Sequence, residues 1–326
     1  MTTPSVARFI DLEPEVEDFE TAVLAGLGRA PKTLPCKFFY DQAGSELFER
    51  ICELDEYYPT RTEIALLRRI AAPVAALIGA DCHLIEFGSG ASTKVRILLD
   101  ALVSPARHTA VDISRDHLRA AADELARSFP EVEIVALCAD YTRPFEVPAA
   151  TNPPHAKRVG FFPGSTIGNF TPDEAIAFLR SAAGLLDGGD FLIGVDLKKD
   201  VDVLTAAYND GQGVTAAFNL NLLARVNREL GGDFDLDAFE HRAHYDAREG
   251  RIEMHLISRR AQIVAIGDHR FDFAVGETIH TENSYKYAIE EFRAIAERAG
   301  FTALECWTDP GNLFSIHYLR AAGGAP

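Results

Sequence analysis

Basic residues, cysteines and long apolar runs are all scarce in this sequence of 326 residues, and each shortage excludes a class of protein. Only 32 lysines and arginines stand against 49 acidic residues, giving a net charge of −17. Such a surface repels nucleic-acid phosphates and anionic lipids. No segment reaches the roughly 20 uncharged apolar residues that a membrane span needs. The sequence therefore predicts neither a nucleic-acid partner nor a membrane partner.

Cysteine usage and the N-terminal residues point to a reducing compartment. The five cysteines are scattered and form no CxxC pair, and the stretch MTTPSVARFIDLEPEVEDFE lacks the basic-then-apolar order of an export signal. Together these features predict a cytoplasmic protein with reduced thiols. We also expect no metal, because no acid or thiol near the pair His241 and His244 in the sequence completes a ligand set.

Between Asp81 and Lys199, apolar strands alternate with amphipathic helices. Strands are predicted near 82–87, 108–113, 133–138, 158–163 and 191–197, with helices near 92–102, 115–129 and 172–187. This alternation is typical of a parallel sheet covered on both faces. A helix near 288–300 and two strands near 302–307 and 313–319 then follow. The whole predicts an α/β, Rossmann-like sheet of seven strands, one of them antiparallel.

A different pattern interrupts this sheet. Helices are predicted over 201–209 and 214–230, and the segment FDLDAF is predicted to begin another helix. A long strand over 251–265 is expected to pair with 271–275 across a turn. We therefore predict a sheet domain formed by 61–200 and 288–326, and a second, smaller domain formed by 1–60 and 201–287.

A glycine turn joins the first predicted strand of this sheet to the helix that follows it. In EFGSG, Gly88 and Gly90 let the backbone turn tightly and approach a ligand, because neither carries a Cβ atom. The third glycine of a dinucleotide fingerprint is missing. The shortened turn is more typical of a methyl-donor site than of a pyrophosphate site. An ordinary strand-to-helix turn is the alternative.

Acidic residues end the next two strands. Asp112 lies 24 positions after Gly88, close to the offset expected for a carboxylate that accepts ribose hydroxyls. Asp140 and Tyr141 follow the third strand, where an acid and an aromatic ring suit the edge and face of adenine. Each Asp alone could instead cap a helix, but three consecutive strand ends favour a nucleoside site.

Six longer motifs occur in collinear order between about residues 30 and 320. They are KFFYDQAGSELFERICELDEYYPTRTE (37–63), EFGSG (86–90), FFPGSTIGNFTP (161–172), YNDGQGVTAAFNLNLLARVNREL (208–230), RIEM (251–254) and TENS (281–284). In this combination the chain resembles the histidine Nα-methyltransferases of ergothioneine biosynthesis. The resemblance implies a class I methyltransferase fold, S-adenosylmethionine as cofactor and trimethylation of L-histidine to hercynine. Because the wider family includes an N-methyltransferase for prenylated tryptophan, a tryptophan-like substrate is the alternative.

The resemblance also implies which residues form the site. The expected cofactor-binding residues are Tyr57, Gly88, Lys94, Asp112, Asp140 and Tyr141. The positions expected to hold the substrate's amino and carboxylate groups, and so to be catalytic, are Tyr40, Asn169 and Tyr208. Further substrate contacts are expected from Tyr57, Gly164, Met254, Glu282 and Ser284. A small-molecule substrate and a monomeric enzyme are expected.

The chemistry of these residue types agrees with that assignment. Neutral Asn and Tyr side chains can hold an amine whose hydrogen count changes at every methylation. Glu282 and Ser284 are two positions apart, so in an extended segment both side chains share one face and can meet the two nitrogens of an imidazole. An indole has a single N–H and would leave one of them unsatisfied. Without the resemblance, a solvated Glu and half-buried core tyrosines would be the simpler interpretation.

Other features received a structural interpretation. Asp196 is predicted to cap a strand end, Lys198 and Lys199 to lie on a solvated face, and Arg61 and Glu63 to make hinge or interdomain contacts. Two rival functions remain from the residues alone: a dinucleotide oxidoreductase, which the missing third glycine argues against, and a ligand sensor that has lost catalysis.

Overall fold

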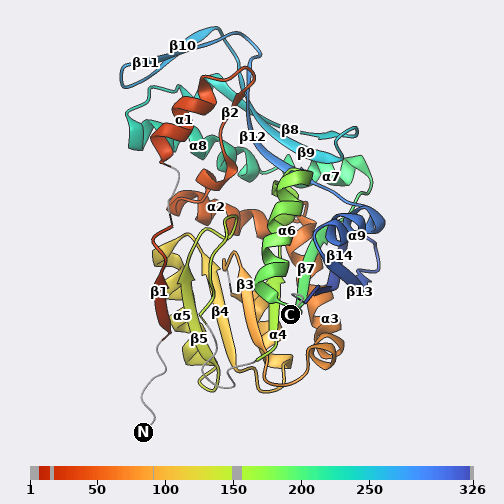
Figure 1. Ribbon diagram of the computed structural model, residues 1–326. Helices are drawn as coiled ribbons and strands as arrows, with labels where there is room; N and C mark the ends of the chain where they lie inside the picture. Colours follow the sequence, from red (N-terminus) through yellow and green to blue (C-terminus); the bar gives the residue numbers. More distant parts are fainter. Residues whose placement is uncertain (1–6, 15–17, 91, 149–155, 324–326) are drawn as a thin grey trace. The chain divides into compact units, whose positions relative to one another are not determined.

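A computed structural model of the chain describes residues 7–14, 18–90, 92–148 and 156–323 and divides it into two compact units (Figure 1). The sheet unit contains Thr62–Leu197, Tyr287–Pro326 and the N-terminal strand. The insertion unit contains Glu17–Arg61 and Lys198–Lys286. The sequence analysis placed residues 1–60 as a whole with the insertion, whereas the N-terminal strand belongs to the sheet unit. The first six residues, part of the stretch searched for an export signal, lie outside the described residues.

The sheet unit is built on one large, mostly parallel sheet. Its strands, in spatial order, are β1 (Arg8–Asp11), β5 (Glu133–Cys138), β4 (Arg107–Asp112), β3 (His83–Phe87), β6 (Arg158–Phe162), β7 (Asp190–Asp196), β14 (Phe314–Ala321) and β13 (Phe301–Thr308). All neighbours are parallel except β14, which runs antiparallel to both β7 and β13. This confirms the predicted Rossmann-like sheet with its antiparallel strand. The edge strand β1 makes an eighth strand that was not predicted, because four residues are too few for a period-2 pattern.

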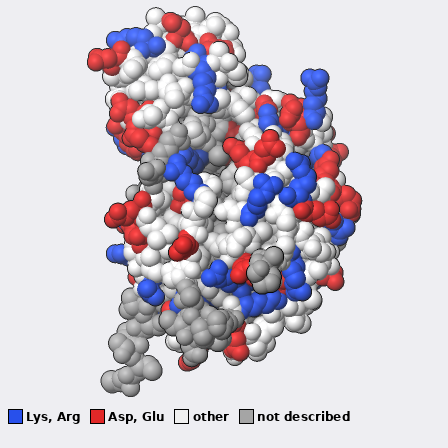
Figure 2. Space-filling view, viewed as in Figure 1, with Lys and Arg blue, Asp and Glu red and all other residues white. Residues whose placement is uncertain are grey.

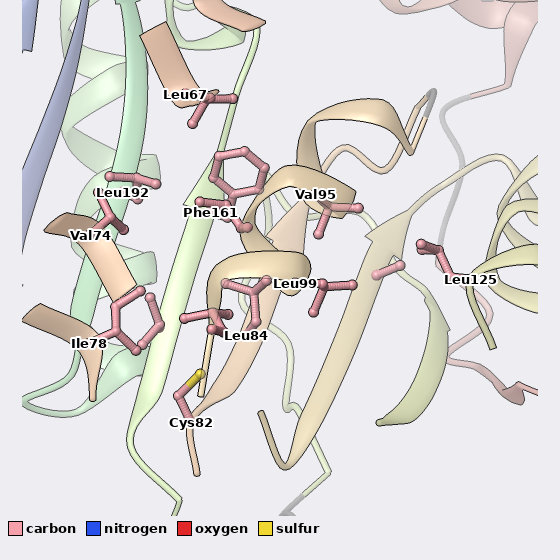
Figure 3. Close-up of a cluster of buried hydrophobic side chains, with 14 of the residues drawn as sticks. Leu67, Val74, Ile78, Cys82, Leu84, Val95, Leu99, Leu125, Phe161 and Leu192 are labelled. Atoms are coloured by element: carbon pink, nitrogen blue, oxygen red, sulfur yellow. The ribbon is translucent and has the colours of Figure 1, made fainter. Parts of the chain in front are cut away.

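Helices α3 (Tyr58–Ile78), α4 (Thr93–Ala101) and α5 (Arg115–Ser128) supply the apolar core on one face of this sheet. Figure 3 shows side chains of this core, among them Val74, Val95 and Leu125 from the helices and Leu84 and Phe161 from the strands. All of these residues are buried. The cluster fixes the start of α4, and therefore the turn that precedes it.

Helices α6 (Pro172–Leu186) and α9 (Ile289–Arg298) contribute the aromatic contacts of a second cluster. Phe178 of α6 lies 5.7 Å from Phe87 and 4.6 Å from Phe162, measured between ring centroids. Phe292 of α9 lies 4.7 Å from the His317 ring. A capping box formed by Thr171 and Glu174 starts α6 immediately after the STIGN segment, so that segment has a defined end.

The insertion unit combines helices with a small sheet and a hairpin. Its elements are α1 (Phe19–Leu27), β2 (Lys32–Thr33), η1 (Cys36–Phe39), α2 (Gln42–Glu53), α7 (Val201–Tyr208), α8 (Val214–Leu230), η3 (Leu236–Ala238), β8 (Phe239–Asp246), β9 (Arg251–Ser258), β10 (Gln262–Ile266), β11 (His269–Phe273) and β12 (Thr278–Tyr285). The sheet has the order β2-β12-β9-β8, and β10 pairs with β11. The predicted hairpin between these last two strands is confirmed.

Two predictions inside this unit are wrong. The FDLDAF segment does not begin an α-helix: Asp235 caps the short 3₁₀ turn η3, and the chain then enters β8, whose pairing with β9 outweighs the helical pattern. The long strand over 251–265 is two strands, β9 and β10, which the chain separates between Ser258 and Gln262.

Strand β9 alternates between a buried and a more exposed face. We call the side that carries Ile252, Met254 and Leu256 the inner face of the small sheet; these residues are buried. The inner face packs on α7 and α8, since His241 of β8 bonds both the carbonyl oxygen of Tyr208 and the amide of Asn219. The opposite, outer face carries Glu253 and His255.

The surface carries both signs of charge. Figure 2 shows acidic and basic side chains interspersed over the face in view. A search of the described residues finds no helix with the length and apolarity that a bilayer crossing requires.

Candidate active site

The glycine turn after β3 has the predicted geometry. Gly88 adopts a left-handed φ of +75°, a conformation that disfavours side chains, and its N–H donates to the Val111 carbonyl oxygen at 2.9 Å. An added Cβ at Gly88 would contact the Tyr141 ring at 3.7 Å. Ser89 is buried, and its hydroxyl has no hydrogen-bond partner among the described residues. A buried hydroxyl without a partner at a glycine turn fits a bound ligand that supplies one.

Acidic groups stand at the ends of the next two strands, as predicted. Asp112 ends β4 and accepts the Ser114 N–H at 2.8 Å. Burial raises the pKa of its carboxyl group to about 6. Asp140 follows β5 and accepts both the N–H and the hydroxyl of Thr142, at 2.9 and 2.6 Å. The carboxyl ends of neighbouring parallel strands thus bring the turn, both acids and Tyr141 to one edge of the sheet.

Lys94 is held at the same edge by a buried carboxylate that the sequence analysis interpreted differently. Lys94 Nζ lies 2.5 Å from Glu63 Oε2, and Glu63 is only 1% exposed. Both Glu63 oxygens also accept the Gly164 N–H at 2.9 Å. Gly164 has a φ of +83°, and an added Cβ would lie 3.4 Å from Lys94 Nζ. Glu63 therefore joins three segments within the sheet unit, a role that the sequence analysis did not assign to it.

Asn169 ends the 3₁₀ helix η2 (Thr166–Asn169), which follows the turn at Gly164. It is half-buried, and no hydrogen bond of its side chain is found within the part of the chain that is described. Ser165, in a left-handed conformation, fixes the start of η2 by accepting the Asp196 N–H at 2.9 Å. The amide of Asn169 is thus carried on a short, anchored turn.

The predicted tyrosines of the insertion unit gather in one aromatic cluster. Tyr40 lies 5.6 Å from Phe48 and 5.8 Å from Phe218, between ring centroids, and both contacts are edge-on. Tyr57 lies 6.3 Å from Phe48 and 6.2 Å from Tyr208. Burial raises the pKa of Tyr57 well above its usual value, so this phenol stays neutral at ordinary pH. The cluster offers π faces and neutral hydroxyls together.

A β-bulge in β12 places Glu282 and Ser284 on the inner face of the small sheet. His280 lies opposite His255, but Glu282 lies opposite Met254, because the register shifts by one residue between them. Ser284 in turn lies opposite Ile252. Glu282 and Ser284 therefore share the inner face, and the predicted contact of Met254 with this pair is a cross-strand one.

Hydrogen bonds and burial define the electrostatics of the pair. The Tyr208 hydroxyl donates to Ser284 Oγ at 2.8 Å. Glu282 also adds to the electrostatic surroundings of Tyr57. Burial raises the pKa of the Glu282 carboxyl group to about 7, although the positive charge of Lys286 opposes this rise. A ligand N–H that donates a hydrogen bond to this carboxylate would therefore stabilise its charged form.

The sequence analysis missed several residues, both at the strand ends of the sheet unit and among the substrate-binding candidates of the insertion unit. Glu63 was visible in the motif but lacked a partner until the fold brought Lys94 beside it. Phe48 and Phe218 lie in quoted motifs too, with nothing in their spacing to mark them. Lys286 bonds both Ser284 and Tyr208, and its position two residues after Ser284 was the available signal.

One group of side chains among the described residues could hold a metal ion. His244, Glu253 and His255 lie on the outer face with their ligand atoms within 4.8 Å of one another. Both Glu253 oxygens already have partners, since Arg251 bonds Oε1 at 2.8 Å and His255 bonds Oε2 at 3.0 Å. This hydrogen-bond network accounts for the cluster without an ion. The acid that the sequence analysis did not find near His244 lies across the strand pair.

Comparison with known proteins gives a consistent result. The family model described as histidine-specific methyltransferase, SAM-dependent, matches residues 19–321. A histidine N-alpha-methyltransferase of Mycolicibacterium smegmatis is 45% identical over 320 residues, covering 96% of this chain and 98% of that protein. One of Mycobacterium tuberculosis is 44% identical over 300 residues, covering 90% and 92%. Ergothioneine biosynthesis protein 1 of Neurospora crassa is 32% identical over 302 residues, covering 89% of this chain and 33% of that longer protein.

Proposed function

The chain belongs to the family of S-adenosylmethionine-dependent, histidine-specific methyltransferases, and from that premise we propose that it trimethylates the α-amine of L-histidine to hercynine. Methylation of histidine in ergothioneine biosynthesis follows from the family and its relatives. The number of transfers and the roles of individual residues are the proposed part.

The residues at the strand ends of the sheet unit fit the cofactor. Ser89 has a buried hydroxyl in need of a partner, Asp112 offers a carboxylate to the ribose, and Asp140 and Tyr141 offer an acceptor and a ring to adenine. Lys94, fixed by Glu63, completes the set. When bound, S-adenosylmethionine would supply a methyl group on a sulfonium: the amine lone pair forms the new N–C bond as the C–S bond breaks in line, and the neutral thioether leaves.

Tyr40, Asn169 and Tyr208 are proposed to hold the amino acid's amine and carboxylate. A free α-amine has a pKa near 8 and is therefore mostly protonated at pH 7. Because only the neutral amine has a lone pair that can attack the methyl group, the site must be able to bind the neutral form. None of these three side chains carries a charge that would trap the ammonium form, and each can act as donor or acceptor. The faces of Tyr40 and Tyr57 also suit a nitrogen that becomes a permanent cation, an interaction worth about 0.5–2 kcal/mol.

One observation supports histidine over tryptophan most directly. Glu282 and Ser284 share the inner face of the small sheet, beside Met254, so a carboxylate and a hydroxyl stand on the same side of β12. An imidazole has two nitrogens for these two groups, whereas an indole has one N–H and would leave a buried group unsatisfied at about 1–3 kcal/mol.

Incubation with each amino acid and S-adenosylmethionine, followed by mass spectrometry, tests the proposal. We expect histidine to gain three methyl groups, a mass increase of about 42 units, and the mass of tryptophan to remain unchanged. Methylation of tryptophan but not histidine would move the chain to the alternative substrate. A histidine product that stops at one methyl group would refute trimethylation alone.

The cytoplasmic location and the monomeric state expected from the sequence remain predictions. Sedimentation of the purified protein checks the second: a single species near the 35.7 kDa of one chain is expected.

A further inference from the structure

A buried lysine that the proposed mechanism does not use lies beside the substrate-binding pair of the insertion unit. Lys286 is 1% exposed and follows Ser284 by two residues. Its Nζ atom lies 2.8 Å from Ser284 Oγ and 3.0 Å from Tyr208 Oη, and 4.9 Å from the centre of the Tyr208 ring. Because burying an ammonium group costs free energy, a lysine kept at this buried position calls for a function.

The three polar atoms form a closed ring of hydrogen bonds with a fixed direction. A lysine ammonium only donates, so Lys286 donates to both hydroxyl oxygens. Tyr208 donates to Ser284 at 2.8 Å. Ser284 Oγ thus accepts two hydrogen bonds, which occupy both of its lone pairs. The Ser284 hydroxyl can then take part in a further bond only as a donor.

The neighbouring acid has the opposite polarity. An ionised Glu282 only accepts hydrogen bonds, and it projects from the same face two residues earlier. The inner face therefore presents one acceptor and one donor, in that order along β12. Of the forms of an imidazole ring, only the neutral one has one N–H and one unprotonated nitrogen.

We propose that Lys286 is a specificity-determining positioning residue, which forces Ser284 to donate and thereby selects the neutral imidazole whose N–H faces Glu282. This inference rests on the proposed histidine substrate. Lys286 does not touch the ring; it acts through Ser284. Its positive charge also disfavours an imidazolium, which would place a second N–H against the Ser284 hydroxyl. A phenyl ring offers neither nitrogen, so it leaves both Glu282 and Ser284 unsatisfied.

A double-mutant cycle between Lys286→Met and Ser284→Ala tests whether the lysine acts through the serine. Histidine and phenylalanine dissociation constants are measured by calorimetry for the full chain, its two single variants and the double variant. We expect Lys286→Met to weaken histidine binding about tenfold in the parent chain and less than twofold when Ser284 is already Ala. Phenylalanine binding should change less than twofold in both backgrounds.

Equal losses in the two backgrounds, or equal losses for both amino acids, would overturn the proposal, because a merely structural lysine weakens every ligand alike. Lys32→Met is the matched control, since Lys32 pairs with Glu277 on the same small sheet. If Lys286→Met does not fold, Lys286→Gln takes its place in the cycle with the same expectation. Failure of the parent chain to bind or methylate histidine would refute the proposed function instead, so the two results are distinguishable.

Discussion

Glu282 on β12 lies directly opposite Met254 on β9, although His280, two residues earlier, lies opposite His255. The extra residue is Thr281, which is buried and donates its hydroxyl to the Met254 carbonyl oxygen at 3.0 Å. Strict alternation from His280 would place Glu282 and Ser284 on the outer face. The bulge therefore decides that the carboxylate and the hydroxyl point toward Tyr208 rather than away from it.

Removing the acid should separate substrate binding from cofactor binding. We expect Glu282→Ala to weaken histidine binding about 10- to 100-fold, because an imidazole N–H then loses a charged acceptor. S-adenosylmethionine binding should change less than twofold. Glu253→Ala, on the outer face of the same sheet, is the matched control and should leave both affinities unchanged. Calorimetry with each ligand measures this, and equal losses for both ligands would show that Glu282 is structural.

Histidine binding should depend on pH through Glu282. Its pKa of about 7 lies above the usual value for a glutamic acid, so the carboxylate form that accepts an N–H is lost as pH falls through 7. We expect histidine affinity to rise from pH 6 to pH 8 and then level off. In Glu282→Gln, this Glu282-dependent part of the rise should disappear, and only the titration of histidine itself should remain. Identical pH profiles for the two proteins would contradict this account.

Cofactor binding should depend on pH through Asp112. Its pKa of about 6 is also raised, so the carboxylate that accepts ribose hydroxyls is present above pH 6 and protonated below it. We expect S-adenosylmethionine affinity to fall between pH 7 and pH 5. Asp112→Asn should bind more weakly at pH 8 and lose this pH dependence. Asp116→Asn, an exposed acid in the first turn of α5, should behave as the parent chain does.

The turn at Gly164 should tolerate no side chain. Its φ of +83° is a strained conformation for any other residue, and an added Cβ would lie 3.4 Å from both Lys94 Nζ and Thr166 Oγ1. We expect Gly164→Ala to lower the free energy of unfolding by about 1–2 kcal/mol and to weaken cofactor binding. Gly184→Ala, inside α6 with open space at its Cβ, should stabilise the protein by about 0.5–1 kcal/mol. Denaturant unfolding compares the two, and equal effects would contradict the strain argument.

Strands β3 to β7 of the sheet unit were predictable because turn residues bound each of them, whereas the 21-residue helix α3 and the edge strand β1 were not predicted. The sequence located β3 to β7 within one or two residues, and with them Gly88, Asp112 and Asp140. The helix predicted at FDLDAF failed because pairing of β8 with β9 is a non-local interaction, which propensity does not report.

The arrangement of the site was only partly predictable. The spacing of Glu282 and Ser284 predicts that they share a face of the strand. Which face they share depends on the bulge at Thr281, and no residue type in the sequence indicates that bulge. The roles of Glu63 and Lys286 were not predicted because their partners are remote in sequence. Lys94 follows Glu63 by 31 positions, and Tyr208 precedes Lys286 by 78 positions.

The Glu63 carboxylate fastens helix α3, the start of α4 and the loop after β6 to one another, through Lys94 and the Gly164 N–H. These three segments come from distant parts of the chain. A chimera that takes only one of them from a homologue can therefore lose the ion pair with Lys94 or the hydrogen bond from Gly164. Engineering of this scaffold by recombination must therefore transplant the three as a set, however independent they look along the polypeptide.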